Sequence, residues 1–417
     1  MTRPRRWWFH PLLLGLVLAL TLAIAEAAVR LAWSPGSPRQ PVRWGFDPEL
    51  GLAHIPGRYE LPFRRCLAGQ DCEDVRVRFT VDDQGFRATG NAQRTGGRPL
   101  VVVLGDSMIE AAQVDDGRTM CSVLERRLRS RFPGAAVRNA GISSAGFVHY
   151  HARWQKLVAP LRPDVLVVAS FGLNDFRNGS PDLEAFHAMR PHYSRSAAGR
   201  RQVRFQPAPN PHSRLRRFAA SLYQPLELVR FLRWSAAVRA EAGRSERGGP
   251  AFPPDAHIYE EPPPARYAEA VELGREYLHR LVQEARSQGA RVVVVYLPWD
   301  GEALDEAWNA LSAGRASAGD GGRLVRDRPE RIVRTTAEAA GADFVSFSDV
   351  VRALEPAERR SLWHTRTDSH LTEQGNRLLA GLLAPTVGQI LETPDGAPEG
   401  GTPSARPSPR ARTQRDP

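Results

Sequence analysis

Residues 101–107 read Val-Val-Val-Leu-Gly-Asp-Ser, an apolar run that ends abruptly in a glycine, an acid and a serine. An unbroken apolar run bounded by a turn signal is typical of a parallel strand buried on both faces. Helix-like spacing follows over Met108–Arg129. Ser107 is therefore expected just past the carboxyl end of a strand, where open α/β sheets hold their chemistry. The alternative is an ordinary turn in which Ser107 caps the helix.

Strand and helix patterns alternate along the chain beyond this segment. Strands are predicted at Leu100–Leu104, Ala136–Asn139, Asp164–Ser170, Arg291–Leu297 and Asp343–Phe347. Helices are predicted at Thr119–Phe132, His149–Leu161, Ala265–Gln288 and Pro329–Ala340. Apolar, β-branched strands that alternate with helices predict a mostly parallel sheet covered on both faces.

Residues 176–262 interrupt this alternation with Pro-rich ends and a basic, aromatic segment from Arg200 to Arg239. Leu215, Phe218 and Leu222 fall on one helical face. We expect an inserted helical lid that packs on the core. The alternative is a basic face that rests on anionic lipid or glycan.

The amino terminus differs from the rest of the chain. Three arginines among the first six residues precede an uncharged apolar stretch, Trp7–Ala25, which is long enough to cross a bilayer. Flanking positive charge favours a cytoplasmic amino terminus. Ala23-Ile24-Ala25 resembles a signal-peptidase site, but the apolar pattern resumes as far as Trp33, which favours a retained anchor over residues 1–33. Both alternatives place the body of the protein outside the cytoplasm, as an inner-membrane, periplasmic protein or a secreted one.

The remaining segments complete the predicted domain organisation. Residues 34–98 indicate a Pro/Ser-rich linker and a small β-rich lead-in, because Val75–Val81 alternates in polarity. Residues 99–391 form the predicted α/β domain with its insertion. Residues 392–417 are rich in Pro, Gly, Ser and Arg and are predicted to be disordered.

The net charge of +11 in 417 residues does not indicate a nucleic-acid partner. The positive charge is almost all arginine, with Lys156 the only lysine, and it is spread along the chain without a zinc, helix-turn-helix or RNA-binding motif.

Cys66 and Cys72 have a loop-like spacing that suits a small disulfide in an oxidising compartment. Cys121 lies in an apolar helical pattern and is expected to be a buried hydrophobe.

A serine nucleophile needs a base, an acid that orients the base, and donors for the developing oxyanion. The candidate base is His370, which lies in a loop-like stretch before an amphipathic helix. Asp368, two residues earlier, is the acid that could hold the ring nitrogen facing away from Ser107. His364 is a rival base without an acid at similar spacing. A surface histidine beside a capping aspartate is the structural alternative.

Two further turns follow predicted strands and offer oxyanion donors. Asn174 lies in Phe171-Gly172-Leu173-Asn174-Asp175, after the third predicted strand, and its side-chain amide is a neutral donor. The small residues of 139–146 would let a backbone N–H approach a substrate. Each turn is also an ordinary composition for a loop. Because all these residues follow successive strands, however, the sequence favours a catalytic interpretation.

The chain resembles the SGNH, or GDSL, hydrolase family. Gly105-Asp106-Ser107 resembles its nucleophile block, Gly172-Leu173-Asn174-Asp175 its G-x-N-D block, and Asp368 with His370 its terminal block. The resemblance implies a three-layer α/β/α, flavodoxin-like fold and no cofactor or metal. It implies that Ser107 attacks an ester carbonyl, that His370 is general base and then acid, and that Asp368 orients it.

The resemblance also implies an oxyanion hole made of the Ser107 amide, a second-block amide and Asn174. Ser144 stands where the family usually has the glycine of its second block, and Gly146 is the alternative position. The acid lies two residues before the histidine, where the family more commonly has it three residues before.

We expect a membrane-tethered esterase that removes an acyl group, such as acetyl, from an envelope glycan or lipid. The alternatives are an O-acyltransferase and a non-catalytic envelope protein.

Overall fold

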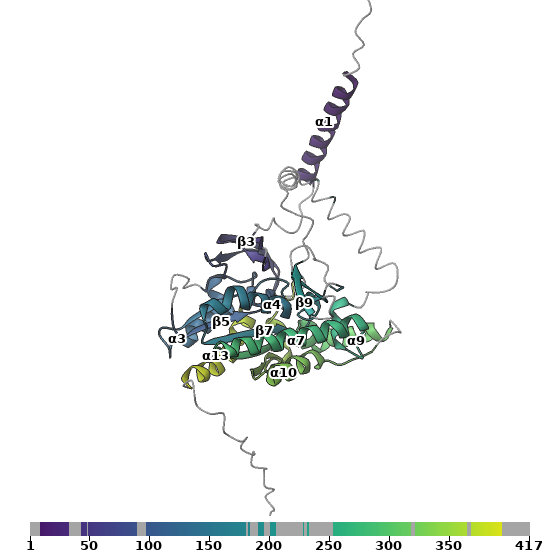
Figure 1. Cartoon of the computed structure of the whole chain (residues 1–417). Coiled ribbons are helices and arrows are strands. Elements are labelled where there is room, and N and C mark those ends of the chain that lie inside the picture. Colours follow the sequence, from purple (N-terminus) through teal and green to yellow (C-terminus); the bar gives the residue numbers. More distant parts are fainter. Residues whose placement is uncertain are drawn as a thin grey trace, which may run out of the picture.

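A five-stranded parallel sheet forms the centre of the computed structural model (Figure 1). The structure describes residues 9–32, 43–47, 49–89, 97–180, 182–183, 191–195, 201–205, 228, 232, 253–317, 322–364 and 368–393. The strands are β5 (Leu100–Leu104), β6 (Ala136–Asn139), β7 (Val165–Phe171), β11 (Arg291–Leu297) and β13 (Asp343–Ser346). Their order is β13-β11-β7-β5-β6. This is the flavodoxin-like order. The strands β6 and β7 lie on opposite sides of β5, and in sheets of this kind ligands bind at the carboxyl ends of the strands where the strand order reverses.

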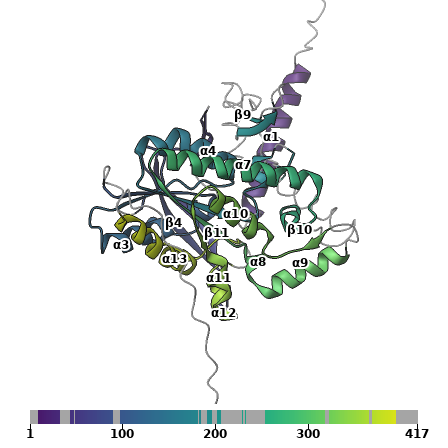
Figure 2. The same ribbon diagram turned by 60° about the horizontal axis from the view of Figure 1, so that its bottom comes forward.

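Alternate residues of the strands enter two separate cores. Val102, Leu166 and Val294 pack with one set of helices, whereas Val101, Val167 and Val295 pack with another. The first set is α4 (Phe147–Arg153), α7 (Ala265–Ser287) and α10 (Arg328–Ala339). The second is α3 (Met120–Arg129), α11 (Phe347–Arg352) and α13 (Glu373–Glu392). Figure 2 shows these layers on opposite sides of the strands, and the predicted three-layer α/β/α fold is confirmed.

The helix-like spacing over Met108–Arg129 does not form one helix, so that part of the prediction is wrong. The first turn, α2 (Ser107–Glu110), ends because Ala111 takes a left-handed conformation with φ 51°. A 3₁₀ turn, η1 (Asp116–Arg118), intervenes before α3 begins behind its Thr119 cap.

The other predicted helices are found within a few residues of their expected ends. The His149–Leu161 helix begins earlier, at Phe147, and its last two turns are a π-helix, η2 (Trp154–Val158), and a 3₁₀ turn, η3 (Ala159–Leu161). The helices α7 and α10 match their predicted ranges closely. The remaining described elements are α8 (Asp300–Ala303), α9 (Asp305–Ser317), α12 (Pro356–Ser361), η4 (Arg177–Gly179), η6 (Pro254–Tyr259), β8 (Pro191–Arg195), β9 (Arg201–Phe205), β10 (Glu260–Glu261) and β12 (Arg323–Leu324).

The expected lid falls mostly outside the described residues. Leu215, Phe218 and Leu222, which carry its predicted helical face, are among those not described. What is described within 176–262 includes an antiparallel pair, β8 with β9. The predicted disordered tail, residues 392–417, also lies outside the described residues from position 394.

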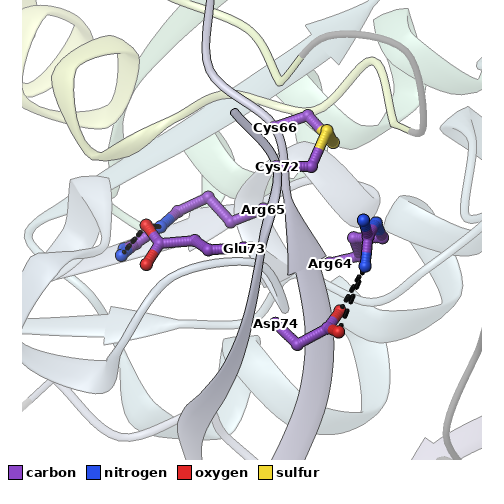
Figure 3. Close-up of a disulfide and its surroundings, with 6 residues drawn as sticks. All are labelled: Arg64, Arg65, Cys66, Cys72, Glu73 and Asp74. Carbon is purple, nitrogen blue, oxygen red and sulfur yellow. Dashed lines mark hydrogen bonds and ion pairs between the residues drawn. A yellow bond between two sulfur atoms is a disulfide. The ribbon is translucent and has the colours of Figure 1, made fainter. Parts of the chain in front are cut away.

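The lead-in consists of two antiparallel strand pairs, β1 (Trp44–Asp47) with β2 (Gly51–His54) and β3 (Gly57–Arg65) with β4 (Glu73–Val81). A disulfide between Cys66 and Cys72 closes the turn of the second pair (Figure 3). A single-residue bridge from Arg87 to Asn139 joins this lead-in to β6 at the edge of the central sheet.

A long apolar helix, α1 (Phe9–Ala32), lies at the amino terminus. Its segment from His10 to Leu31 has a mean hydropathy of 2.4 and none of it is buried against the protein. Its length and composition suit a membrane span, and a signal sequence would have the same properties.

Candidate active site

Ser107 lies at the point where β5 passes into α2. Asp106 caps the helix, because its side chain accepts a hydrogen bond from the Met108 amide at 2.9 Å, so Ser107 is the first helical residue and not the cap. Gly105 permits this sharp turn, since a Cβ there would lie 2.3 Å from a side-chain carbon of Ile109. The Ser107 hydroxyl therefore faces the carboxyl edge of the sheet at the switch between β5 and β7.

Three side chains form a hydrogen-bonded chain at this edge. The Ser107 hydroxyl lies 2.7 Å from Nε2 of His370. On the other side of the ring, Nδ1 of His370 is hydrogen-bonded to Asp368, which also accepts from the His370 amide at 2.9 Å. Gln113 donates to the second carboxylate oxygen of Asp368 at 3.0 Å. This arrangement leaves Nε2 in position to take a proton from the hydroxyl.

The loop that carries His370 is held by pairing with the segment before it. The His364 amide donates to the His370 carbonyl at 2.9 Å, and an antiparallel bridge joins Trp363 to Leu371. Thr372 then caps α13. His364, the rival base, is not hydrogen-bonded to Ser107; its buried ring packs edge-on against Phe63 instead.

The surroundings of His370 favour its protonated form. Burial works against a positive charge, but the hydrogen bond and negative charge of Asp368, with the more distant Asp106 and Glu110, outweigh it and raise the pKa of His370. Conversely, burial would raise the pKa of Asp368, yet its contacts with His370 lower it. An imidazolium that formed during reaction would thus be stabilised by a carboxylate that stays ionised.

Asn174 reaches the same edge from the turn after β7. Its side-chain nitrogen donates to Asp106 at 3.2 Å, so the carboxylate that caps α2 also orients the amide. An amide nitrogen carries two hydrogens, and one therefore remains for an oxyanion near Ser107. Asp106 is fully buried, and burial raises its pKa despite the hydrogen bonds it accepts from Met108 and Asn174.

The two candidate backbone donors after β6, the amides of Gly146 and Ser144, differ in whether they already donate a hydrogen bond. The Gly146 amide donates to Nδ1 of His149 at 3.1 Å, and a Cβ at Gly146 would lie 2.4 Å from the Asp175 carbonyl oxygen. Gly146 is therefore required for close packing. Ser144 has φ 58°, a conformation that favours glycine, and its amide has no hydrogen-bond partner among the described residues. The geometry favours Ser144 as the second amide.

Behind this loop lies a fully buried carboxylate, Glu110. Its side chain accepts hydrogen bonds from the amide of Ser143 at 2.8 Å and from the Ser143 hydroxyl. The lead-in supplies three more partners: Trp44 at 3.1 Å, His54 at 3.0 Å and Arg43 at 3.4 Å. Burial alone would raise the pKa of Glu110, but His54, the charge of Arg43 and the hydroxyl of Ser143 lower it to about 2. The lead-in and the loop before Ser144 are thus joined through one anion.

Asp106, Glu110 and Gln113 are the site residues that the sequence-based assignment did not single out. All three lie within seven positions of Ser107, and Glu110 stands in an apolar helical turn, which is where a buried, partnered charge is unusual. A glutamate in an otherwise apolar turn was therefore the sequence feature that could have identified Glu110. Among the described residues, no group of three or more His, Cys, Asp or Glu side chains is placed to hold a metal ion.

Comparisons with known proteins give one family. The model of the GDSL-like lipase/acylhydrolase family matches residues 103–378. No curated protein matches the chain. Solved structures that resemble it include TesA (14% identity; 70% of this chain and 99% of TesA covered; TM-score 0.36). They also include the acetylxylan esterase Axe2 from Geobacillus stearothermophilus (15%; 72% and 96%; 0.36) and a lipase/acylhydrolase from Enterococcus faecalis (14%; 70% and 95%; 0.36).

Proposed function

The chain belongs to the GDSL-like lipase/acylhydrolase family and is a serine hydrolase, and from this premise we propose that Ser107, His370 and Asp368 cleave an acyl ester of an envelope glycan or lipid. The observation that carries the proposal is the 2.7 Å contact between the Ser107 hydroxyl and Nε2 of His370, with Asp368 on the opposite ring nitrogen. A non-catalytic envelope protein has no need of this alignment, which therefore argues against that alternative.

The proposed reaction has two halves. Ser107 attacks the ester carbonyl while His370 takes its proton, and the oxyanion is held by the amides of Ser107 and Ser144 and the side chain of Asn174. His370 then returns the proton to the departing alcohol, which leaves an acyl group on Ser107. Water, activated by His370, releases the acid. If an acceptor hydroxyl replaced water in this second half, the same site would be an acyltransferase.

The location is proposed from two features outside the site. The apolar helix α1 is long enough to anchor the chain in a bilayer. The disulfide between Cys66 and Cys72 suits an oxidising compartment. Together they support an inner-membrane anchor with the hydrolase domain outside the cytoplasm.

A fluorophosphonate probe tests the proposal directly, because it labels only an activated serine. We expect the purified full-length protein to be labelled at Ser107, to hydrolyse p-nitrophenyl acetate, and to lose both properties in Ser107→Ala. Folded wild-type protein that is neither labelled nor active would reject the proposal. Incubation with envelope extracts, followed by mass measurement of the acyl adduct on Ser107, identifies the acyl group; faster transfer to a glycan acceptor than to water would favour the transferase.

A further inference from the structure

The two turns that carry the proposed oxyanion donors are in direct contact. Ser144 lies in the turn after β6 (residues 143–146, the β6 turn), and Asn174 lies in the turn after β7 (residues 172–175, the β7 turn). A Cβ at Gly146 would lie 2.4 Å from the carbonyl oxygen of Asp175 and 3.2 Å from Cβ of Asn178. No side chain fits between the two backbones here, so a displacement of one turn is transmitted to the other.

Tyr150 connects the helix that follows the β6 turn to the β7 turn. It lies in α4, whose N-cap is Gly146, and it is fully buried. Its hydroxyl donates to Oδ1 of Asp175 at 2.8 Å, and the amide of Phe171 donates to Oδ2 of the same carboxyl group at 2.9 Å. Burial raises the pKa of Tyr150, so the hydroxyl keeps the proton that it donates. The residue after Asn174 is thus held by a side chain from the other turn's helix.

Asn178 makes the reverse connection. It follows the β7 turn, in η4, and its side-chain nitrogen donates to the carbonyl of Ala145 in the β6 turn at 2.9 Å. Its main-chain amide donates to the carbonyl of Asn174 at 2.9 Å. The guanidinium of Arg177 donates to the side-chain oxygen of Asn178 at 3.1 and 3.3 Å, which leaves the nitrogen to face Ala145. The residue after Ser144 is thus held by a side chain that follows the β7 turn.

The β7 turn is also connected to the nucleophile, through Asp106. The carboxylate of Asp106 accepts from the side chain of Asn174 at 3.2 Å and caps the helix that begins at Ser107. The two hydrogen bonds that join the turns therefore belong to the same framework as Ser107. A misplacement of about 1 Å at an active site can cost on the order of 10²-fold in rate, so the separation of the two donors matters for catalysis.

We propose that Tyr150 and Asn178 are positioning residues that hold the two oxyanion donors, the amide of Ser144 and the side chain of Asn174, at a fixed separation. The inference rests on the proposed esterase function and adds to it two residues outside the sequence motifs. Both side chains are fully buried, so each acts through the turn that it holds. Donors fixed in advance need no reorganisation when negative charge develops on the substrate oxygen.

The first test compares kcat and KM for p-nitrophenyl acetate in full-length protein. Tyr150→Phe removes only the hydroxyl and keeps the buried ring, and we expect kcat to fall about tenfold while KM changes less than about twofold. Asn178→Ala removes the bond to Ala145 and should have an effect of similar size. Thr89→Val is the matched control, because it removes a buried hydroxyl that donates to the buried carboxylate of Glu125, in α3, at 3.2 Å. It should retain the wild-type kcat.

A double-mutant cycle separates positioning from a general loss of stability. Asn174→Ala should lower kcat by about 10²-fold or more. Adding Tyr150→Phe to Asn174→Ala should then change kcat by less than about twofold, because the group that Tyr150 positions is already gone. Asn178 holds the other donor, so Asn178→Ala should still lower kcat about tenfold in the Asn174→Ala background. Urea unfolding of every variant measures its stability.

Three outcomes would overturn the inference: a kcat within about twofold of wild type in either Tyr150→Phe or Asn178→Ala, an equal loss of kcat in Thr89→Val, or effects of Tyr150→Phe and Asn174→Ala that multiply. Should Asn178→Ala not fold, the Tyr150→Phe cycle decides alone. Failure of the esterase proposal is seen separately, as wild-type protein that fluorophosphonate does not label. Labelled and active wild-type protein, together with any of the three outcomes, rejects the present inference alone.

Discussion

At the scale of single residues, the proposed mechanism depends on a proton moving between the Ser107 hydroxyl and Nε2 of His370, which lie 2.7 Å apart. Replacing Ser107 by Ala should lower kcat for p-nitrophenyl acetate by about 10⁴-fold or more, since the remaining triad members have no nucleophile to activate. Steady-state hydrolysis measures this. Ser130→Ala, an exposed serine at the end of α3, should retain wild-type activity; an equal loss there would point to a general folding effect.

The pH dependence follows from the raised pKa of His370. Only the neutral imidazole accepts the Ser107 proton, so kcat/KM should rise with pH and reach half its maximum above pH 6.5, the ordinary histidine value. Asp368→Asn removes the charge that raises this pKa, so the half-maximum should move to lower pH while the maximum falls. The midpoint and the maximum are both read from the pH profile of kcat/KM for p-nitrophenyl acetate. His279→Gln, an exposed change on α7, should leave the midpoint in place.

Ser144 offers a residue-scale test of the proposed backbone donor. Its left-handed conformation costs a non-glycine residue about 1–3 kcal/mol, and glycine adopts it freely. Ser144→Gly should therefore keep the amide and the esterase activity, and should not destabilise the fold. A loss of kcat beyond threefold, measured together with urea unfolding, would show that the serine hydroxyl and not the amide matters.

At the scale of elements, the lead-in strands are tied to the loop after β6 through Glu110. Its pKa is lowered to about 2 from 4.5, so its ionised form adds stability that is fully present above pH 4.5 and is lost as the pH falls toward 2. A shift of this size corresponds to on the order of 3 kcal/mol. Wild-type protein should therefore lose about 2 kcal/mol more stability between pH 7 and pH 3 than Glu110→Gln does in paired urea titrations, because the rest of the contribution is lost only below pH 3.

The same variant tests whether the lead-in positions the oxyanion loop. Glu110→Gln leaves Arg43 and His54 without their anion and weakens the hold on Ser143, so kcat should fall roughly 10-fold or more while KM changes little. Glu306→Gln removes an exposed carboxylate paired with Arg360 and serves as the control. If kcat and KM were both unchanged in a destabilised Glu110→Gln protein, the role would be structural only.

At the scale of the whole molecule, the proposed location of the hydrolase depends on whether α1 is retained as a membrane anchor. The helix runs unbroken from Phe9 to Ala32, past the signal-peptidase-like Ala23–Ala25 segment. A retained anchor predicts that the intact chain, with its first residues detectable by mass spectrometry, sediments with membranes and is released by detergent but not by high salt. Soluble protein that begins after Ala25 would instead establish a cleaved signal peptide.

The order of residue types along the chain was enough to predict the sheet, its two helical layers and the edge at which Ser107, Asn174, Asp368 and His370 gather. Those predictions depend on local patterns: buried parallel strands need continuous apolar runs, and loops at their carboxyl ends can carry polar groups. The helix predicted from the spacing of Met108–Arg129 is interrupted, because Ala111 takes a left-handed backbone conformation that ends α2 after one turn.

Only the tertiary structure favoured Ser144 over Gly146 and connected Glu110 to the lead-in, and it placed His370, which the sequence already preferred to His364, in contact with Ser107. Two of these findings depend on contacts between distant positions: Ser107 and His370 are 263 residues apart, and Glu110 and Arg43 are 67 apart. Residue spacing does not encode such contacts, because they are set by how the packed elements bring buried donors and acceptors into hydrogen-bonding range.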